Sequence, residues 1–61
     1  MDVKRAQEIL NAAEKIDVQY NGELVWIDSV DEQNRTATVR SEEQPNPTPE
    51  TVPVELLEEL Q

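Results

Sequence analysis

The chain has 61 residues, with 14 acidic against 5 basic side chains, a formal net charge of -9 and neither cysteine nor histidine. A chain this short forms one small domain, residues 1–61, which buries only about 60% of the surface that its unfolded form exposes. The composition excludes disulfides, thiolate metal sites and histidine acid–base chemistry, and the negative charge would repel the phosphates of a nucleic acid.

A short amphipathic helix is predicted at the N-terminus, over residues 2–13. Apolar residues recur there at spacings of three and four, which places them on one stripe of the helix: Val3, Ala6, Ile9, Leu10 and Ala13. Asp2 can cap the helix N-terminus. About three turns of helix are hardly stable alone, so the stripe is expected to dock on another element.

A β-hairpin is predicted over residues 16–30, because Asn21-Gly22 tolerates the positive φ angles that a type I′ turn requires. The turn sets three facing pairs: Tyr20 with Glu23, Val18 with Val25, and Ile16 with Ile27. Branched aliphatic side chains then share one face of the hairpin. Leu24 and Trp26 point to the other face, opposite Gln19 and Asp17, and need cover from another element.

A third strand is predicted over residues 35–40, with two alternatives for the preceding loop. A three-residue loop, 32–34, with Asn34 in the left-handed region pairs Ile27 with Val39 and Ser29 with Ala37. A four-residue loop pairs Ile27 with Thr38 instead. The first alternative is favoured because it extends the apolar face of the hairpin.

The C-terminal part is predicted to hold an acidic, proline-rich loop at 41–50, an edge strand at 51–54 and a helical turn at 55–60. This order gives an α+β fold, in which the N-terminal helix precedes a small curled antiparallel sheet, an SH3-like partial barrel. The competing interpretation is an open sheet of three or four strands with the helices on one face, completed by a second copy of the chain. The oligomeric state is thus left as monomer or homodimer.

No catalytic, cofactor-binding or metal-binding residue is predicted. Ser29 and Ser41 have no histidine to activate them, so an enzyme is not expected. The best group of oxygen ligands is Asp28, Asp31, Glu32 and Asn34, but its spacing does not match an EF-hand. Counterion attraction explains this cluster better than a built metal site.

Trp26 and Tyr20 are the only aromatic residues, and they support two interpretations. A half-exposed aromatic side chain on a sheet can anchor a protein partner. In a domain with so few large residues, burial of the Trp26 side chain beneath the helix or residues 56–60 is the favoured alternative. An apolar run long enough to span a bilayer is absent from the sequence, so we expect a cytoplasmic protein without a membrane partner.

Five segments with like spacing give the chain a resemblance to the small, acid-soluble spore proteins of the H type from endospore-forming bacteria. They are Met1 to Leu10, Tyr20-Asn21-Gly22 with Val25-Trp26-Ile27, Val30-Asp31-Glu32, Thr36 to Val39, and Thr51-Val52-Pro53-Val54 with Glu55-Leu56. The resemblance implies a protein made in the forespore cytoplasm and kept in the spore core. It carries over no catalytic or ligand residue.

Two functions follow as expectations. The resemblance implies a non-catalytic structural or storage component of the dormant spore, made during sporulation. The alternative is a small SH3-like protein-binding module that uses Tyr20, Trp26 and the 41–50 loop against a basic or apolar partner. DNA binding is disfavoured by the charge of -9.

Overall fold

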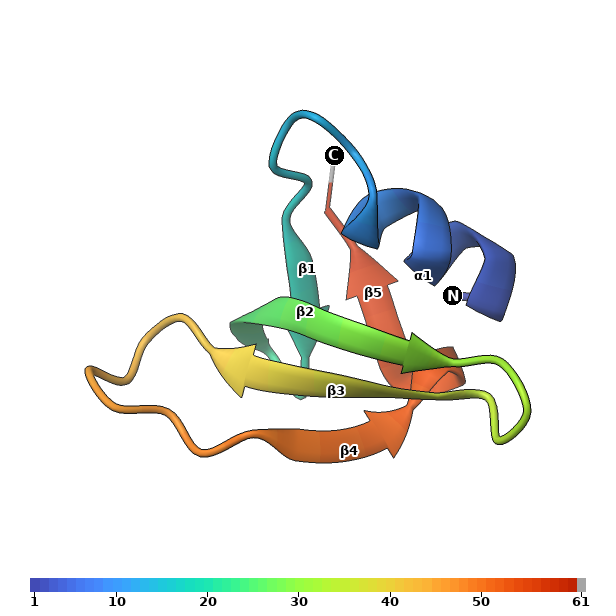
Figure 1. Ribbon diagram of the computed structural model, residues 1–61. Helices are drawn as coiled ribbons and strands as arrows, with labels where there is room; N and C mark the ends of the chain where they lie inside the picture. Colours follow the sequence, from blue (N-terminus) through green and yellow to red (C-terminus); the bar gives the residue numbers. More distant parts are fainter. Residues whose placement is uncertain (61) are drawn as a thin grey trace.

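The computed structural model describes residues 1–60, shown in Figure 1. Within this range one short helix precedes five strands, and a 3-10 turn separates the last two strands. The elements in chain order are α1 (Val3–Leu10), β1 (Val18–Tyr20), β2 (Glu23–Asp31), β3 (Thr36–Ser41), β4 (Glu50–Pro53), η1 (Val54–Leu56) and β5 (Leu57–Glu59).

All five strands belong to one antiparallel sheet in the order β4-β3-β2-β1-β5. Figure 1 shows β2, β3 and β4 side by side, whereas β1 and β5 run across them. The predicted SH3-like partial barrel is wrong, because the sheet is bent but not closed. β4 and β5 lie at its two edges, and η1 carries the chain from one edge to the other instead of pairing them.

The hairpin of β1 and β2 turns at Asn21 and Gly22, as the sequence predicts. Both residues have positive φ, 53° and 80°, as a type I′ turn requires. Val18 faces Val25, which confirms the predicted register. The ladder begins at Val18, so the predicted strand start at residue 16 is two residues too early.

A bulge interrupts the pairing of β2 with β3. Ile27 faces Val39, as predicted, but beyond the register shift Ser29 faces Thr38 rather than Ala37. A bulge places one extra residue in one strand, so Ile27 and Val30 both pack against the core although they lie three residues apart. The prediction was therefore correct on one side of it and wrong on the other.

The loop between β2 and β3 has four residues, 32–35, rather than the predicted three. The left-handed residue is Arg35, with φ of 55°, and not Asn34. The longer loop and the bulge offset each other, which is why the pair of Ile27 with Val39 survives. The carbonyl oxygen of Arg35 accepts a hydrogen bond from the N–H of Val54 at 3.0 Å and so ties this loop to η1.

Helix α1 is shorter than the predicted 2–13. Asp2 caps it as predicted, and its carboxylate accepts a hydrogen bond from the Arg5 N–H at 2.8 Å. At the other end both the main-chain N–H and the side-chain amide of Asn11 donate to the carbonyl of Gln7. This local bond closes the last turn, and the helix ends at Leu10.

The predicted helical turn over residues 55–60 is correct for residues 55 and 56 and wrong for the rest. Its first residues belong to η1, and residues 57–59 form β5, in which Leu57 faces Tyr20 and Glu59 faces Val18. Glutamate and leucine favour a helix locally, but β1 has an edge that can bind another strand. The pairing with this edge outweighs the local preference.

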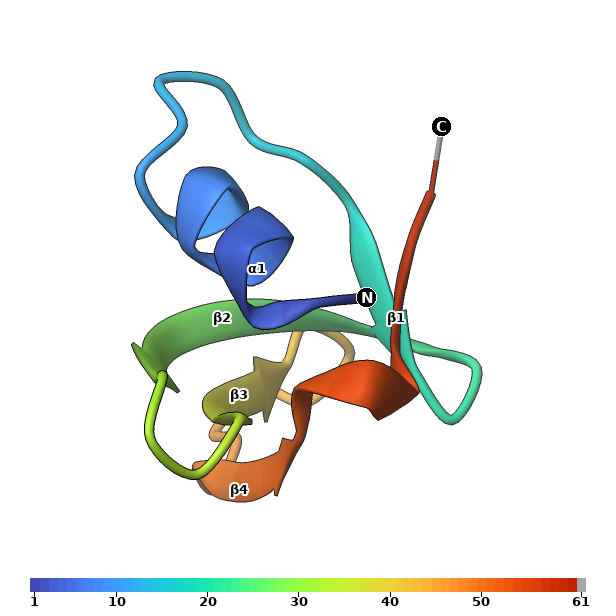
Figure 2. The ribbon, with the colours of Figure 1, turned by 90° about the vertical axis from the view of Figure 1, so that its right-hand side faces the viewer.

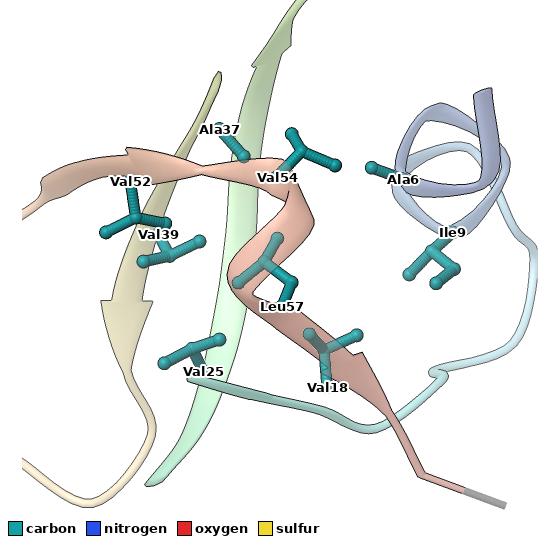
Figure 3. Close-up of a cluster of buried hydrophobic side chains, with 9 residues drawn as sticks. All are labelled: Ala6, Ile9, Val18, Val25, Ala37, Val39, Val52, Val54 and Leu57. Atoms are coloured by element: carbon teal, nitrogen blue, oxygen red, sulfur yellow. The ribbon is translucent and has the colours of Figure 1, made fainter. Parts of the chain in front are cut away.

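The core is a layer of small aliphatic side chains between α1 and the bent sheet (Figures 2 and 3). Figure 2 shows α1 against β2. Figure 3 shows that the core side chains point toward one another: Ala6, Ile9, Val18, Val25, Ala37, Val39, Val52, Val54 and Leu57. Ile16 and Ile27 are partly buried and pack against this cluster, on the face that the sequence predicts.

Each edge strand of the sheet has one outward-facing position without a free main-chain donor. The N–H of Val54 points inward to Arg35, so the alternate position, Pro53, points outward, and proline has no N–H. At the other edge the carbonyl of Leu57 accepts a hydrogen bond from the main-chain nitrogen of Met1 at 3.2 Å. The N–H of Leu57 is bonded to the carbonyl of Val54.

Candidate functional site

The three parts of the predicted binding surface do not form one face. Tyr20 is partly buried and packs against the core. Trp26 is adjacent to the buried Val25 on β2, so its side chain lies on the opposite face of the sheet. The Trp26 residue is 44% exposed, and the favoured expectation that it is buried is wrong. Tyr20 therefore cannot share a docking surface with Trp26.

Trp26 instead meets side chains from two other segments. The Nζ atom of Lys15, in the loop after α1, lies 4.2 Å from the centroid of the Trp26 ring. The same ammonium lies 2.5 Å from Oε1 of Glu42, just after β3, and 3.5 Å from Oδ1 of Asp17. The Glu42 hydrogen bond and carboxylate charge raise the pKa of Lys15. We call Trp26, Lys15, Asp17 and Glu42 the Trp26 cluster.

Sequence reasoning singled out Trp26 and the 41–50 loop but missed Lys15 and Asp17. These two residues lie three positions and one position before β1, and alternation continues along this segment. They therefore lie on the same side of the sheet as Trp26. The signal was present in the predicted register, which placed Asp17 opposite Trp26.

The four predicted oxygen ligands do not converge. Asp28 pairs with Arg40, with 2.8 Å between Oδ2 and Nε. Asp31 accepts hydrogen bonds from the side-chain and main-chain nitrogens of Asn34, which lower the pKa of its carboxyl. Within residues 1–60 no group of three or more acidic side chains is placed to hold a metal ion. Asp31 and Asn34 instead shape the β2–β3 loop.

A groove of about 750 Å³ lies between the start of α1, the β2–β3 loop and η1. Lys4 and Arg35 line it, and neither forms an ion pair within residues 1–60. Three carboxylates also line it, from Asp2, Glu32 and Glu55. The mixture of charges gives the groove no clear preference for ligands of either sign.

A bidentate salt bridge between Arg5 and Glu59 joins α1 to β5. The Arg5 Nε and terminal nitrogen donate to the two carboxylate oxygens of Glu59 at 2.8 and 2.6 Å. A planar guanidinium and a carboxylate match each other in this geometry. The contact raises the pKa of Arg5 and lowers that of Glu59, mainly through the hydrogen bonds between their side chains.

Replacing Glu59 by glutamine is expected to destabilise the fold at neutral pH but not in acid. Because the pKa of Glu59 is lowered in the folded state, its stabilising effect is present above the ordinary glutamate pKa of 4.5. This effect is lost as the pH falls through the lower value of the folded protein. Urea unfolding of both proteins across this range tests the prediction.

The control for this prediction is Glu8→Gln. Glu8 also contacts Arg5, at 3.3 Å, but its side chain is exposed and lies on the same helix. We expect Glu8→Gln to have a smaller effect than Glu59→Gln at neutral pH, because exposed ion pairs contribute little. A stability difference for Glu59→Gln that stayed constant as the pH fell would contradict the assignment.

Comparison with known proteins identifies the family. A model of the small acid-soluble spore protein H family matches residues 1–59. The chain is 44% identical over 59 residues to small, acid-soluble spore protein H 1 of Geobacillus kaustophilus, covering 97% of each chain. It is 42% identical over 59 residues to protein H 2 of Geobacillus thermodenitrificans, again covering 97% of each chain.

The chain is also 54% identical over 39 residues to small, acid-soluble spore protein H 1 of Bacillus anthracis. This shorter match covers 64% of this chain and 66% of the relative. No solved structure matches the chain. Within the described residues, none of the helical structure is long and apolar enough to cross a bilayer. The whole-length match and the identities above show that this chain belongs to the small acid-soluble spore protein H family.

Proposed function

We propose that this protein is a non-catalytic structural or storage component of the dormant spore, made in the forespore cytoplasm and kept in the spore core. Membership of a spore protein family supports the setting. The observation that carries the role is the distribution of charge. Five of the fourteen acidic side chains form ion pairs within residues 1–60, and nine do not.

These nine carboxylates give the protein a strongly hydrated surface of one dominant sign. Like charges repel, so copies of the chain stay separate and soluble when they are concentrated. The small aliphatic core needs no ligand to fill it. Both properties suit a protein that is accumulated rather than one that turns over a substrate.

The test follows the protein through sporulation and germination. A fluorescent fusion and immunoblots should show it first in the forespore, then at a constant level in dormant spores, and then in decline as germinated spores resume growth. Accumulation in growing cells would contradict the spore setting. Persistence at the dormant level through several divisions would contradict a reserve that is consumed.

A further inference from the structure

The Trp26 cluster has the chemical form of a cation site that is occupied by the protein's own lysine. The face of an indole ring attracts an ammonium or guanidinium group more strongly than the ring of any other aromatic side chain does. Here the ring carries the Lys15 ammonium at 4.2 Å, and the carboxylates of Asp17 and Glu42 contact the same ammonium. An aromatic face with two carboxylates beside it selects cations.

One carboxylate oxygen of Glu42 does not bind Lys15. Its Oε1 binds Lys15, whereas Oε2 is buried and has no hydrogen-bond partner within residues 1–60. The Glu42 side chain is only 12% exposed. Buried carboxylate oxygens are normally paired, so this atom marks a place where a further N–H donor would be favourable.

Lys15 is held weakly enough to be displaced. Its side chain is 45% exposed, and it lies in the segment between α1 and β1, outside any helix or strand. Its ion pair with the exposed Asp17 and its cation–π contact with the exposed Trp26 contribute little in water, so the bond to Glu42 is the main contact that a ligand must replace. A ligand with several cations can compete because its other charges meet the surrounding carboxylates.

The charge of the whole chain decides which ligand would compete. At -9 the protein attracts basic partners and repels acidic ones. Trp26 is also one of four large apolar residues exposed on the surface, the others being Leu10, Leu56 and Leu60. An exposed tryptophan surrounded by polar groups is the usual composition of an interface anchor.

We propose that Trp26, Asp17 and Glu42 form a docking site for a lysine- or arginine-rich segment of a partner protein, and that Lys15 occupies this site in the free protein. The incoming side chain takes the place of Lys15 over the indole and donates to the free oxygen of Glu42. Lys15 then moves into solvent with its loop. This proposal does not rest on the proposed storage role, which requires no protein partner.

The experiment titrates the protein with a hexalysine peptide at about 10 mM salt, where charges interact over roughly 30 Å. Trp26 is the only tryptophan, so its fluorescence reports on the site directly. We expect the wild type to bind with a change in emission. Lys15→Gln should bind about fivefold more tightly, because the internal competitor is gone.

Four further variants separate a specific site from general attraction. Lys4→Gln changes the net charge by the same amount as Lys15→Gln but lies in a different groove, so it should strengthen binding less. Glu42→Gln should weaken binding more than the matched loss of the exposed Glu55 carboxylate in Glu55→Gln. Trp26→Leu, followed by calorimetry, should bind about fivefold more weakly than wild type.

Equal effects of Lys15→Gln and Lys4→Gln would overturn the proposal, because they would show attraction by net charge only. So would a wild type that does not bind hexalysine, or one that binds hexaglutamate through Lys15. Far-UV circular dichroism establishes that each variant is folded. If Glu42→Gln is unfolded, the comparison of Lys15→Gln with Lys4→Gln still tests the proposal. Both lysine side chains lie on the surface, so neither variant is expected to unfold.

Discussion

Replacing Leu57 by alanine is expected to lower the free energy of unfolding by about 3 kcal/mol. Leu57 is 1% exposed and is the largest of the side chains that are fully buried. Its removal leaves a cavity in a core of small aliphatic residues that have few ways to fill it. A domain of this size holds only about 3–5 kcal/mol in total, so the variant should keep no more than about 2 kcal/mol and unfold at much lower urea.

The matched control is the preceding residue. Leu56 is 51% exposed, and Leu56→Ala removes the same atoms from the surface. We expect a change within about 0.5 kcal/mol. Urea unfolding followed by far-UV circular dichroism compares the two. Equal losses would contradict the structure, in which Leu56 at the end of η1 is exposed and Leu57 at the start of β5 is buried.

Replacing Ile9 by alanine is expected to cost about 2 kcal/mol, since it removes the main contact of α1 with the core. Ile9 is 9% exposed, whereas the adjacent Leu10 is 39% exposed. Alanine improves the helix propensity at either position, so the difference between the two variants isolates the docking of the helix. A helix of eight residues does not persist without it.

The control is Leu10→Ala, for which we expect a loss of no more than about 0.5 kcal/mol. Amide hydrogen exchange adds a local measurement. Ile9→Ala should raise the exchange rates of α1 more than those of the β2–β3 ladder, because opening of the helix leaves the strands paired. A uniform increase over the whole chain would indicate that helix and sheet unfold as one unit.

The parts of the fold that the sequence predicted are those set by local chemistry. Asn21-Gly22 determines its turn because few residues accept positive φ at both positions. The turn in turn places Val18 opposite Val25 and defines the core face of the hairpin. Asp2 is likewise recognisable as a cap, because it lies directly before the first apolar residue of the helical stripe.

The parts that could not be predicted depend on distant contacts. The segment that starts at Glu55 has the composition of a helix, and only the free edge of β1 makes a strand of its later residues. The bulge at residues 27–29 moves the core-facing positions from Val25 and Ile27 to Val30, a break in alternation that the predicted register did not take into account. The open sheet depends on which strands pair at a distance: β4 pairs with β3 and β5 pairs with β1, so the two strands that η1 joins lie at opposite edges.

The candidate site was predicted in part. The sequence indicates that another element must pack on Trp26. In the structure the Lys15 side chain, and not a helix, lies over its ring. Tyr20 was expected beside it, although its position two residues from Val18 already places it on the core side. Lysine side chains are long and mobile, so their partners depend on the folded geometry rather than on spacing in the chain.

The blocked edges of the sheet bear on how densely this protein can be packed. An unpaired strand edge is a template on which further chains can stack into cross-β fibres. Here Pro53 removes a donor from one edge, and Met1 occupies a carbonyl of the other. Together with mutual repulsion at -9, these two features disfavour the stacking of crowded copies through their strand edges.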